Sequence, residues 1–456
     1  LSTSIQRLSS GLRINSAKDD AAGLAISERF TSQIRGLDQA VRNANDGISL
    51  SQTAEGSLQS SSDILQRIRV LAVQSVNSTN SASDRQALNA EVVQLASELE
   101  RIAQTSEFNG QKVLNGDISS AMFQVGANAN QTITATTANF STSKYGNYRM
   151  GAKAATATDT SGDLTLGTSV STLLSTATVG ASRVAGGAVV INGALGSATI
   201  TTAAGDTAKA AATLINGKTN ITGVKATART EIDLAGLGTG SYTLNVTSDN
   251  TTTAVAITFS TTGNTADGLA SAITAFNERA STTGVTAKLN QAKTGITLTN
   301  ESGSNITIAS GAGNTDFTVA GITVASTSTA LATGQLTLDS DKSFGVVGGN
   351  STDFFSLAAS TAGKLQEVSK VDVSSADAAT RTLAMVDSAI SAINGQRAKY
   401  GALQSRFETT VRNLQLSTEN MASARSQMRD ADFATETASL SRSQILQQAG
   451  TAMVAQ

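Results

Sequence analysis

The chain of 456 residues contains no cysteine, histidine, proline or tryptophan. Without histidine and cysteine it lacks the usual ligands of zinc, copper and iron, and also the histidine base on which serine and cysteine nucleophiles depend. Without cysteine it cannot form the disulfide framework of a small extracellular scaffold. The absence of proline favours long uninterrupted helices, because proline costs about 3 kcal/mol inside a helix.

Charge is also scarce: Lys, Arg, Asp and Glu together make up 15% of the chain, and the formal net charge is -2. No dense patch of Lys and Arg is interleaved with aromatic residues, so the sequence predicts no nucleic-acid partner. No stretch approaches the roughly 18 consecutive apolar residues of a membrane-spanning helix. No signal peptide is recognisable at the start of the chain.

Acidic residues can catalyse glycoside hydrolysis without histidine or cysteine, so paired carboxylates are the remaining candidates for catalysis. Such pairs occur at Asp19-Asp20, Asp430/Asp432, Asp339/Asp341 and Asp159/Asp163. The first two fall near predicted helix ends, where capping explains them, and the other two lie in loops typical of solvated turns. No loop has the spacing of an EF-hand calcium site. The sequence therefore predicts no enzyme activity, no catalytic or metal-binding residue and no cofactor.

The two ends of the chain carry heptad patterns, and the middle carries none. Apolar residues recur at alternating steps of three and four, which describes helices packed side by side. The predicted seam contains Phe30, Ile34, Leu37, Val41, Val386, Ile393, Tyr400, Phe407, Leu414 and Met421. Arg397 and Gln404 are polar seam positions, which cost stability but help to fix the register. We therefore predict that helices 24–105 and 381–429 pair as an antiparallel coiled-coil core, with the middle inserted on this stalk.

Smaller local patterns predict further elements. Ser83 followed by Gln86 predicts a capping box at the start of a helix, and Asn-Gly pairs predict a β-hairpin within residues 106–135. From about residue 141 to residue 371, Thr, Ser, Ala and Gly dominate and short strands alternate with turns. Strand, short helix and strand recur in the same order at 199–226 and 257–287. The predicted fold class is multidomain α+β, with a β-rich inserted region built from small α+β repeat units.

Specific motifs at both ends resemble one protein family. The segment LSSGLRINSAKDDAAGLAI (8–26) closely resembles the N-terminal signature of bacterial flagellins, and DADFATE (430–436) and QILQQAG (444–450) resemble the C-terminal one. The resemblance implies a structural subunit that polymerises into the flagellar filament for motility, with its middle displayed outside. Against the family pattern the chain is truncated at both termini, so the resemblance also implies that it polymerises poorly.

The resemblance and the composition together predict six segments. The helical core is expected in two parts, 24–145, with its hairpin at 106–135, and 372–429. Between them lie two units of a variable outer domain, 146–235 and 236–371. The two ends, 1–23 and 430–456, are expected to be remnants of the inner coiled coil.

The resemblance further implies partners and a location. The main partner is the chain itself, in a helical homopolymer, and the others are the flagellar export machinery, a secretion chaperone and the filament cap. The location is extracellular, in the filament, after export without a cleaved signal peptide. Surface glycans are a candidate partner of the variable middle region.

Residues 66–74 (QRIRVLAVQ) are similar to the flagellin helix that the animal innate receptor Toll-like receptor 5 recognises. The resemblance assigns receptor contacts to Arg67, Leu71 and Glu91, with Arg406 flanking them. Arg67 and Leu71 are four residues apart and can therefore share one helix face. Val70 stands where the family often has an acidic residue, which bears on receptor potency. Because the same surface serves subunit stacking, its primary expected role is assembly.

Two other functions compete with the filament subunit. A hook-filament junction protein shares flagellin-like ends but keeps the signatures only loosely. A cell-surface module that binds glycans or host surfaces could be carried on a flagellin scaffold by the middle region, and binding of that region to a polysaccharide array would distinguish it from a spacer.

Overall fold

The computed structural model describes residues 2–151, 173–176, 184, 186–290, 292–319, 321–348 and 361–455. The acidic pair Asp159/Asp163 and part of the expected segment 146–235 lie outside these residues. The chain divides into two compact units. Unit 1 contains Leu1–Ser61, Glu100–Ser141 and Ile393–Gln456, and unit 2 contains Ser62–Leu99 and Thr142–Ala392.

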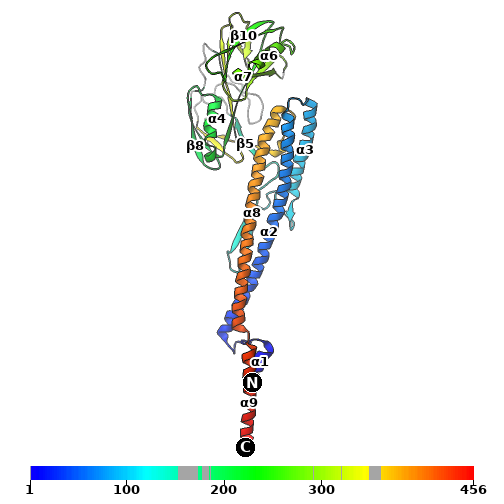
Figure 1. Cartoon of the computed structure of the whole chain (residues 1–456), viewed down its shortest axis with the longest axis vertical. Coiled ribbons are helices and arrows are strands. Elements are labelled where there is room, and N and C mark those ends of the chain that lie inside the picture. Colours follow the sequence, from blue (N-terminus) through cyan, green and yellow to red (C-terminus); the bar gives the residue numbers. More distant parts are fainter. Residues whose placement is uncertain are drawn as a thin grey trace. The chain divides into compact units, whose positions relative to one another are not determined.

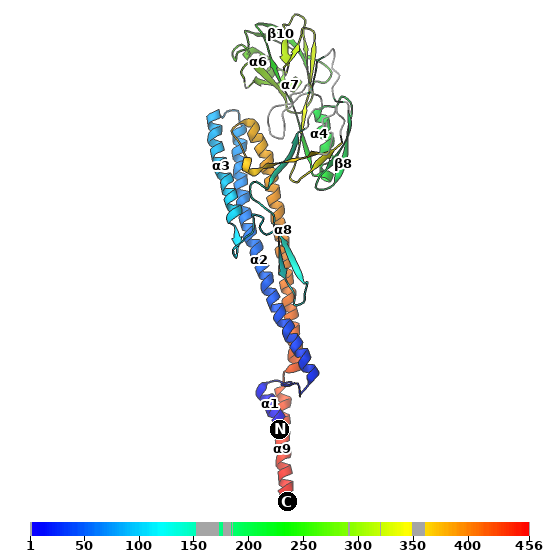
Figure 2. The ribbon, with the colours of Figure 1, turned by 180° about the vertical axis from the view of Figure 1, so that it is seen from behind.

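Five helices of the described chain come from its two ends. They are α1 (Ser2–Ser10), α2 (Ala21–Val76), α3 (Ala82–Thr105), α8 (Ala376–Arg429) and α9 (Phe433–Ala455). Helices α2 and α8 have 56 and 54 residues, and no proline interrupts their backbone hydrogen bonds. They lie side by side and run in opposite directions, as two opposite views show (Figures 1 and 2). The predicted antiparallel helical core built from both chain ends is therefore confirmed.

The cap at the start of α3 differs from the predicted one. The Ser81 N–H and hydroxyl donate to the Asp84 carboxylate at 2.9 and 2.8 Å, and the Asp84 N–H donates back to Ser81 Oγ at 3.2 Å. The predicted box of Ser83 and Gln86 is wrong. An aspartate carboxylate accepts the free backbone N–H and also interacts favourably with the positive end of the helix dipole, which a glutamine amide does not.

The segment predicted to hold one hairpin holds two. Strand β1 (Glu107–Phe108) pairs with β2 (Gln111–Lys112), and β3 (Ser120–Gln124) pairs with β4 (Thr132–Thr136). In the first hairpin Asn109 and Gly110 have φ angles of 50° and 75°. These angles lie in the left-handed region, which Asn and Gly tolerate best, so the Asn-Gly signal was correct for that turn.

The second hairpin packs against the helices of unit 1 through one aromatic side chain. Phe123 of β3 meets Phe407 of α8 edge to face, with ring centroids 5.5 Å apart. Gly47 of α2 leaves room for the same ring, because a Cβ at this position would lie 2.6 Å from Phe407 Cζ. The Asn43 side chain adds a hydrogen bond of 2.9 Å to the Gln124 carbonyl. Phe407 thus joins α2, α8 and the hairpin.

The middle of the chain is a series of short strands and short helices. The strands are β5 (Gly146–Gly151), β6 (Leu173–Thr176), β7 (Gly187–Asn192), β8 (Ser197–Thr202), β9 (Lys225–Ala235), β10 (Gly240–Thr247), β11 (Val255–Thr261), β12 (Thr286–Leu289), β13 (Gly295–Asn300), β14 (Ile306–Ser310), β15 (Phe317–Val319), β16 (Ile322–Val324), β17 (Thr329–Thr333), β18 (Gln335–Ser340), β19 (Gly345–Val347), β20 (Thr361–Ala362) and β21 (Lys364–Glu367). The helices are α4 (Ala208–Asn216), α5 (Thr219–Thr222), α6 (Ala270–Glu278), α7 (Ala280–Thr283) and the 3-10 turn η1 (Val368–Lys370).

These strands form three antiparallel sheets in unit 2. One has the order β11-β10-β14-β17-β6, and a second has the order β20-β19-β7-β8. The third has the order β12-β13-β9-β18-β5-β21, with β15 paired to β9 and β16 paired to β15. The long strand β9 is central to the third sheet, since it pairs with both β13 and β18.

Two apolar cores lie on this framework. The first is built around Ile191, Ile215 and Val346, and the second around Tyr242, Phe276 and Phe317. We call the parts that surround them the first module, which comprises β5 and residues 184, 186–228 and 336–348, and the second module, which comprises residues 229–290, 292–319 and 321–335. Strand β9 begins in the first module and ends in the second, so one continuous backbone connects the two cores.

The predicted internal repeat is confirmed by matching hydrogen bonds in the two modules. Asn216 at the end of α4 bonds through its side chain to both backbone groups of Ala226. Asn277 at the end of α6 bonds in the same way to Ala287. Gly223 after α5 and Gly284 after α7 both adopt left-handed conformations, with φ of 73° and 70°. Each module therefore repeats one strand, helix and strand arrangement.

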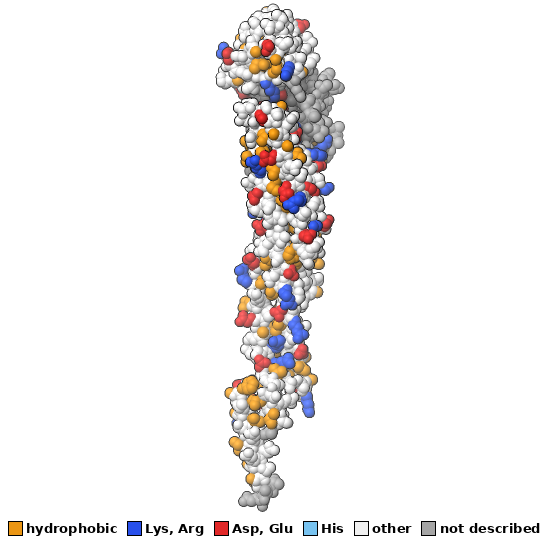
Figure 3. Space-filling model, turned by 90° about the vertical axis from the view of Figure 1, so that its right-hand side faces the viewer, with side chains coloured by type: hydrophobic (Ala, Val, Ile, Leu, Met, Phe, Trp, Pro, Cys, Tyr) orange, Lys and Arg blue, Asp and Glu red, His pale blue; other side chains and the backbone are white. Residues whose placement is uncertain are grey.

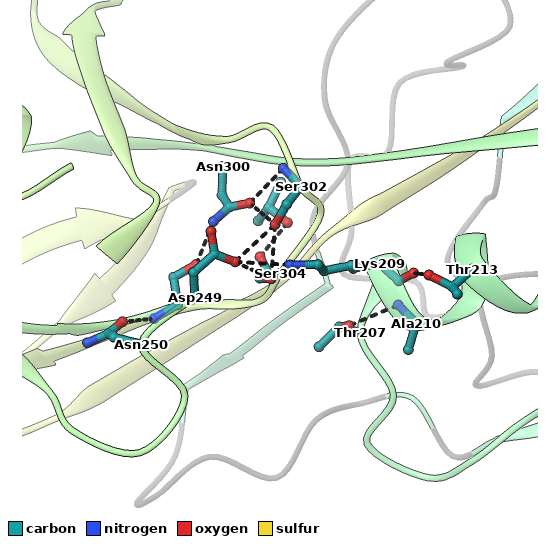
Figure 4. A network of polar contacts seen from close by, with 11 residues as sticks. Thr207, Lys209, Ala210, Thr213, Asp249, Asn250, Asn300, Ser302 and Ser304 are labelled. Atoms are coloured by element: carbon teal, nitrogen blue, oxygen red, sulfur yellow. Dashed lines mark hydrogen bonds and ion pairs between the residues drawn. The ribbon is translucent and has the colours of Figure 1, made fainter. Parts of the chain in front are cut away.

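A polar network joins the two modules (Figure 4). The Asp249 carboxylate accepts hydrogen bonds from Ser304 Oγ at 2.6 Å and Ser302 Oγ at 3.0 Å. Lys209 of α4 places its Nζ 3.5 Å from the same oxygen. Burial opposes ionisation of Asp249, but the bonds from Ser304, Ser302 and Asn300 and the charge of Lys209 outweigh it, so the pKa of Asp249 is lowered.

We predict opposite effects for two glycine substitutions on α2. Gly47→Ala should destabilise the helical core by about 1–3 kcal/mol, because the added methyl group would collide with the Phe407 ring. Gly56→Ala should stabilise it by about 0.5–1 kcal/mol, because no atom lies within 4 Å of the new Cβ and alanine is the better helix former. Urea unfolding followed by circular dichroism measures both changes. A Gly47→Ala variant more stable than the parent chain would contradict the described packing.

The Asp249 network should make the stability of the modules depend on acid pH. Because the pKa of Asp249 is lowered in the folded chain, the stability it contributes is present above its ordinary pKa of 3.8 and is lost as the pH falls through the folded value. Asp249→Asn should therefore lower the thermal midpoint of unfolding at pH 7. It should also make the decline of that midpoint between pH 4 and pH 2 less steep. Asp267→Asn, at an exposed site of the same module, is the matched control. Equal acid profiles for both variants would refute the role of the network.

Candidate functional site

The surface with the most exposed apolar side chains in unit 1 lies on α1 and α9. Phe433, Ile445, Leu446 and Met453 on α9 are between 57% and 81% exposed, and Ile5 on α1 is also exposed. Figure 3 shows hydrophobic side chains gathered over this part of the molecule, at the bottom of the view, with few charged ones among them. We call these five residues the terminal apolar surface.

Local backbone contacts set the position of these helices. Helix α1 ends at Ser10, and the next residue, Gly11, has a left-handed backbone conformation with a φ of 69°. Beyond it, Leu12 forms an isolated bridge with Asp430, and the Ala431 N–H donates to the Gly11 carbonyl at 2.9 Å. The Arg13 side chain donates to the Met428 carbonyl at 2.7 Å. The segments that carry the family motifs at the two ends therefore meet directly.

The predicted seam residues lie as follows along α2 and α8. Leu37, Ile34 and Leu414 of unit 1 are buried, as are Ile393, Tyr400 and Phe407 in the same unit and Val386 in unit 2. Phe30, Val41 and Met421 are half-buried. Leu37, Ala40 and Leu414 form an apolar cluster against which Val41 and Met421 pack. Burial raises the pKa of the Tyr400 hydroxyl.

The polar seam positions share a partner that sequence reasoning missed. Gln404 Nε2 donates to Glu55 Oε2 at 3.0 Å, and Arg397 Nη2 lies 3.8 Å from Glu55 Oε1. A glutamate on α2 between two polar side chains of α8 favours one register of the two helices, because a shift by one turn would leave the charges without these partners. The heptad pattern indicated Arg397 and Gln404, but it gave no signal for the position across the seam.

A groove lies beside the seam in unit 1. It has a volume of about 480 Å³ and is lined by Leu37 of α2, Leu414 and Met421 of α8, and Val125 and Ala127 of the turn after β3. The polar residues that line the groove are uncharged, and they include Gln33 of α2, Ser417 of α8 and Asn128 of the turn.

The residues assigned to receptor recognition lie in different environments. Arg67 Nη2 and Glu91 Oε1 are 2.7 Å apart, and both side chains are well exposed on α2 and α3 of unit 2. Leu71 is only 1% exposed, whereas Val70 on the same helix is 56% exposed. Arg406 is exposed on α8 in unit 1. The structure therefore brings Arg67 and Glu91 together and places the Leu71 side chain inside the helical packing.

Two absences concern the described part of the chain. Its Asp and Glu side chains nowhere gather in groups of three or more that could hold a metal ion. Among the helices described, none has the length and hydropathy needed to span a lipid bilayer.

Comparison with known proteins gives a consistent result over the whole chain. Residues 1–119 match the family model of the bacterial flagellin N-terminal helical region, residues 383–456 match that of the C-terminal helical region, and residues 188–250 match the flagellin hook IN motif. The last match covers most of the first module and the start of the second.

Individual relatives agree with these matches. The B-type flagellin of Pseudomonas aeruginosa is 42% identical, over 100% of this chain and 92% of its own length. A flagellin of Salmonella rubislaw is 36% identical, with the same coverage of 100% and 92%. The solved structure of FliC from Burkholderia pseudomallei is 20% identical to this chain. The match covers 79% of this chain and 99% of that structure, with a TM-score of 0.31. On the sequence evidence, the chain belongs to the bacterial flagellin family, as a structural subunit of the extracellular flagellar filament.

Proposed function

We propose that the terminal apolar surface on α1 and α9 provides contacts between neighbouring subunits of the filament. The observation that carries this proposal is the exposure of Phe433, Ile445, Leu446 and Met453 on one helix. Burying such a side chain contributes roughly 1.5–3 kcal/mol, so their exposure along one helix favours docking against other apolar surfaces.

The composition of α9 makes this contact favourable. Its 23 residues contain one acidic and one basic side chain, Glu436 and Arg442. Few charges would therefore lose water when two such surfaces meet, and the desolvation penalty that weakens buried ion pairs is small. Arg7 of α1 lies 3.9 Å from Glu436, so this charge already has a partner within the chain.

The same exposure suggests how the subunit behaves before assembly. An exposed apolar helix promotes premature association, so a secretion chaperone that covers α9 would keep the subunit monomeric until the flagellar export machinery delivers it. The filament cap would then hold arriving subunits while their terminal helices dock. Binding of surface glycans by the middle region stays a prediction of the sequence.

Removal of apolar side chains from α9 should weaken assembly without unfolding the subunit. For the double variant Ile445→Ser, Leu446→Ser, the critical concentration for polymerisation should rise roughly tenfold or more, because two buried contacts are lost at every subunit interface. Sedimentation and electron microscopy of the full-length flagellin measure this. The matched control is Gln447→Ser, Gln448→Ser on the same exposed helix. Equal critical concentrations for both double variants would exclude α9 as the docking surface.

We infer a second function from the exposed Arg67–Glu91 pair, namely recognition by Toll-like receptor 5. The pair joins α2 to α3 at 2.7 Å and lies next to Val70, which is exposed on the same helix. A guanidinium held in this way offers a fixed set of donors to a receptor. Leu71 has a different role in this proposal, because a buried leucine supports the recognition surface from within the helical packing.

Substitutions at the two positions should separate these roles. Arg67→Ala should lower the response of cells that report on the receptor while leaving the thermal midpoint of the monomer unchanged. Leu71→Ala should destabilise the subunit by about 2–5 kcal/mol. Arg69→Ala is the control, because it removes an ion pair of the same length, to Asp387 at 2.7 Å, on the same helix. A normal receptor response to Arg67→Ala would overturn the assignment.

A further inference from the structure

The two modules share a fold but differ in their surfaces. The exposed large apolar side chains in the described parts of the modules are Leu195, Leu214, Ile221 and Val347, all in the first module. Leu195, in the turn between β7 and β8, is 72% exposed, and Ile221 of α5 is 47% exposed. In the described part of the second module, no large apolar side chain is among the exposed ones.

Leu195 and Ile221 belong to one local surface. A Cβ at Gly223 would lie 3.5 Å from Leu195 Cδ1, and a Cβ at Gly196 would lie 3.7 Å from Ile221 Cγ2. The turn between β7 and β8 therefore packs against α5 with its exposed leucine next to the exposed isoleucine. We call these two residues the apolar patch.

The internal repeat shows that the fold does not require this patch. The two modules align through the matching bonds of Asn216 and Asn277 and the matching turns at Gly223 and Gly284. In this alignment Ile221 corresponds to Thr282. The same backbone is thus built in the second module with an exposed polar side chain at this position. Because an exposed apolar pair is costly in water and unnecessary for folding, it indicates a contact surface.

Charge indicates what that surface contacts. The first module contains five Lys or Arg and three Asp residues, whereas the second contains four Lys or Arg and seven Asp or Glu. Lys218 and Lys225 flank the patch and are exposed, and Asp267 and Asp316 are exposed on the second module. A basic apolar patch is complementary to an acidic surface and is repelled by a copy of itself.

The complementary surface must come from another chain. Strand β9 and the Asp249 network already connect the two modules of one chain, and in this arrangement the patch is still exposed. In a filament, identical subunits repeat at fixed spacing, so a weak contact gains from its repetition along the polymer. A contact between unlike surfaces of identical chains is also the type that continues through an open helical assembly, whereas a like-to-like contact closes as a dimer.

We propose that the apolar patch of the first module docks on the acidic second module of a neighbouring subunit, so that the displayed modules form a connected outer layer of the filament. The proposal rests on the function as a filament subunit. The contact combines burial of Leu195 and Ile221 with attraction between Lys218 or Lys225 and the acidic neighbour, so it should weaken as salt concentration rises.

The first test uses trypsin, because the exposed Lys218 and Lys225 are cleavage sites beside the patch. In filaments of the full-length flagellin, cleavage at these lysines should be roughly tenfold or more slower than in monomers, since burial of Leu195 and Ile221 together contributes at least that factor to docking. The double variant Leu195→Ser, Ile221→Thr should lose this protection in filaments and should be cleaved like the parent chain as a monomer. Ile221→Thr copies the residue of the second module, so the fold tolerates it.

A second measurement identifies the partner surface. The chain has no native cysteine, so subunits with Leu195→Cys can be co-assembled with subunits that carry Ser281→Cys or Ala312→Cys at exposed sites of the second module. A bismaleimide should join the two kinds of subunit in filaments and not in monomers, and subunits that all carry Leu195→Cys should not join.

The outcomes separate this proposal from the filament function. Absence of filaments from the parent flagellin would refute the subunit function itself. Normal filaments in which Lys218 and Lys225 are cleaved as fast as in monomers would overturn the docking proposal alone. Cross-links between two Leu195→Cys subunits would overturn it as well, because the contact would then be like-to-like.

Discussion

The packing of α2 against α8 is the interaction on which the rest of the structure depends. The two helices come from opposite ends of the chain, and Phe407 fixes them by filling the space beside Gly47 and meeting Phe123 of the hairpin. The entropic cost of closing a loop grows only slowly with its length. A stalk made in this way therefore tolerates a long insertion, and the middle of the chain can evolve surfaces of its own without loss of the helical core.

The distribution of apolar surface suits a protein whose working state is a polymer. Along the seam, apolar side chains are buried within the chain, while Ile445, Leu446 and Met453 on α9 remain exposed, as the proposed subunit contact requires. The scarcity of charge, at 15% of residues, reduces the desolvation cost of bringing such surfaces together. Of the charged residues near the seam, Glu55 has specific partners in Arg397 and Gln404. Such contacts determine the register of the two helices and contribute less to the strength of their packing.

The repeat in the middle shows which residues a fold needs and which it leaves free. Asn216 and Asn277 make the same pair of backbone bonds, and Gly223 and Gly284 make the same left-handed turn, because backbone groups at helix ends must be satisfied in either copy. Ile221 and Thr282 occupy matching exposed positions and differ, because solvent imposes no shape there. The Asp249 network then couples the two copies through side chains outside the repeated bonds.

By itself the sequence determined the elements that depend on local periodicity and turn chemistry: the paired terminal helices, the Asn109-Gly110 turn and the strand, helix and strand repeat. Its end motifs also determined the family. Only the tertiary structure decided which residues meet across elements. It replaced the predicted α3 cap by Ser81 and Asp84, supplied Glu55 as the partner of Arg397 and buried Leu71. Periodicity gives the spacing of residues along one helix, but neither their orientation toward a second helix nor the charge that faces them, because those depend on contacts between segments far apart in the chain.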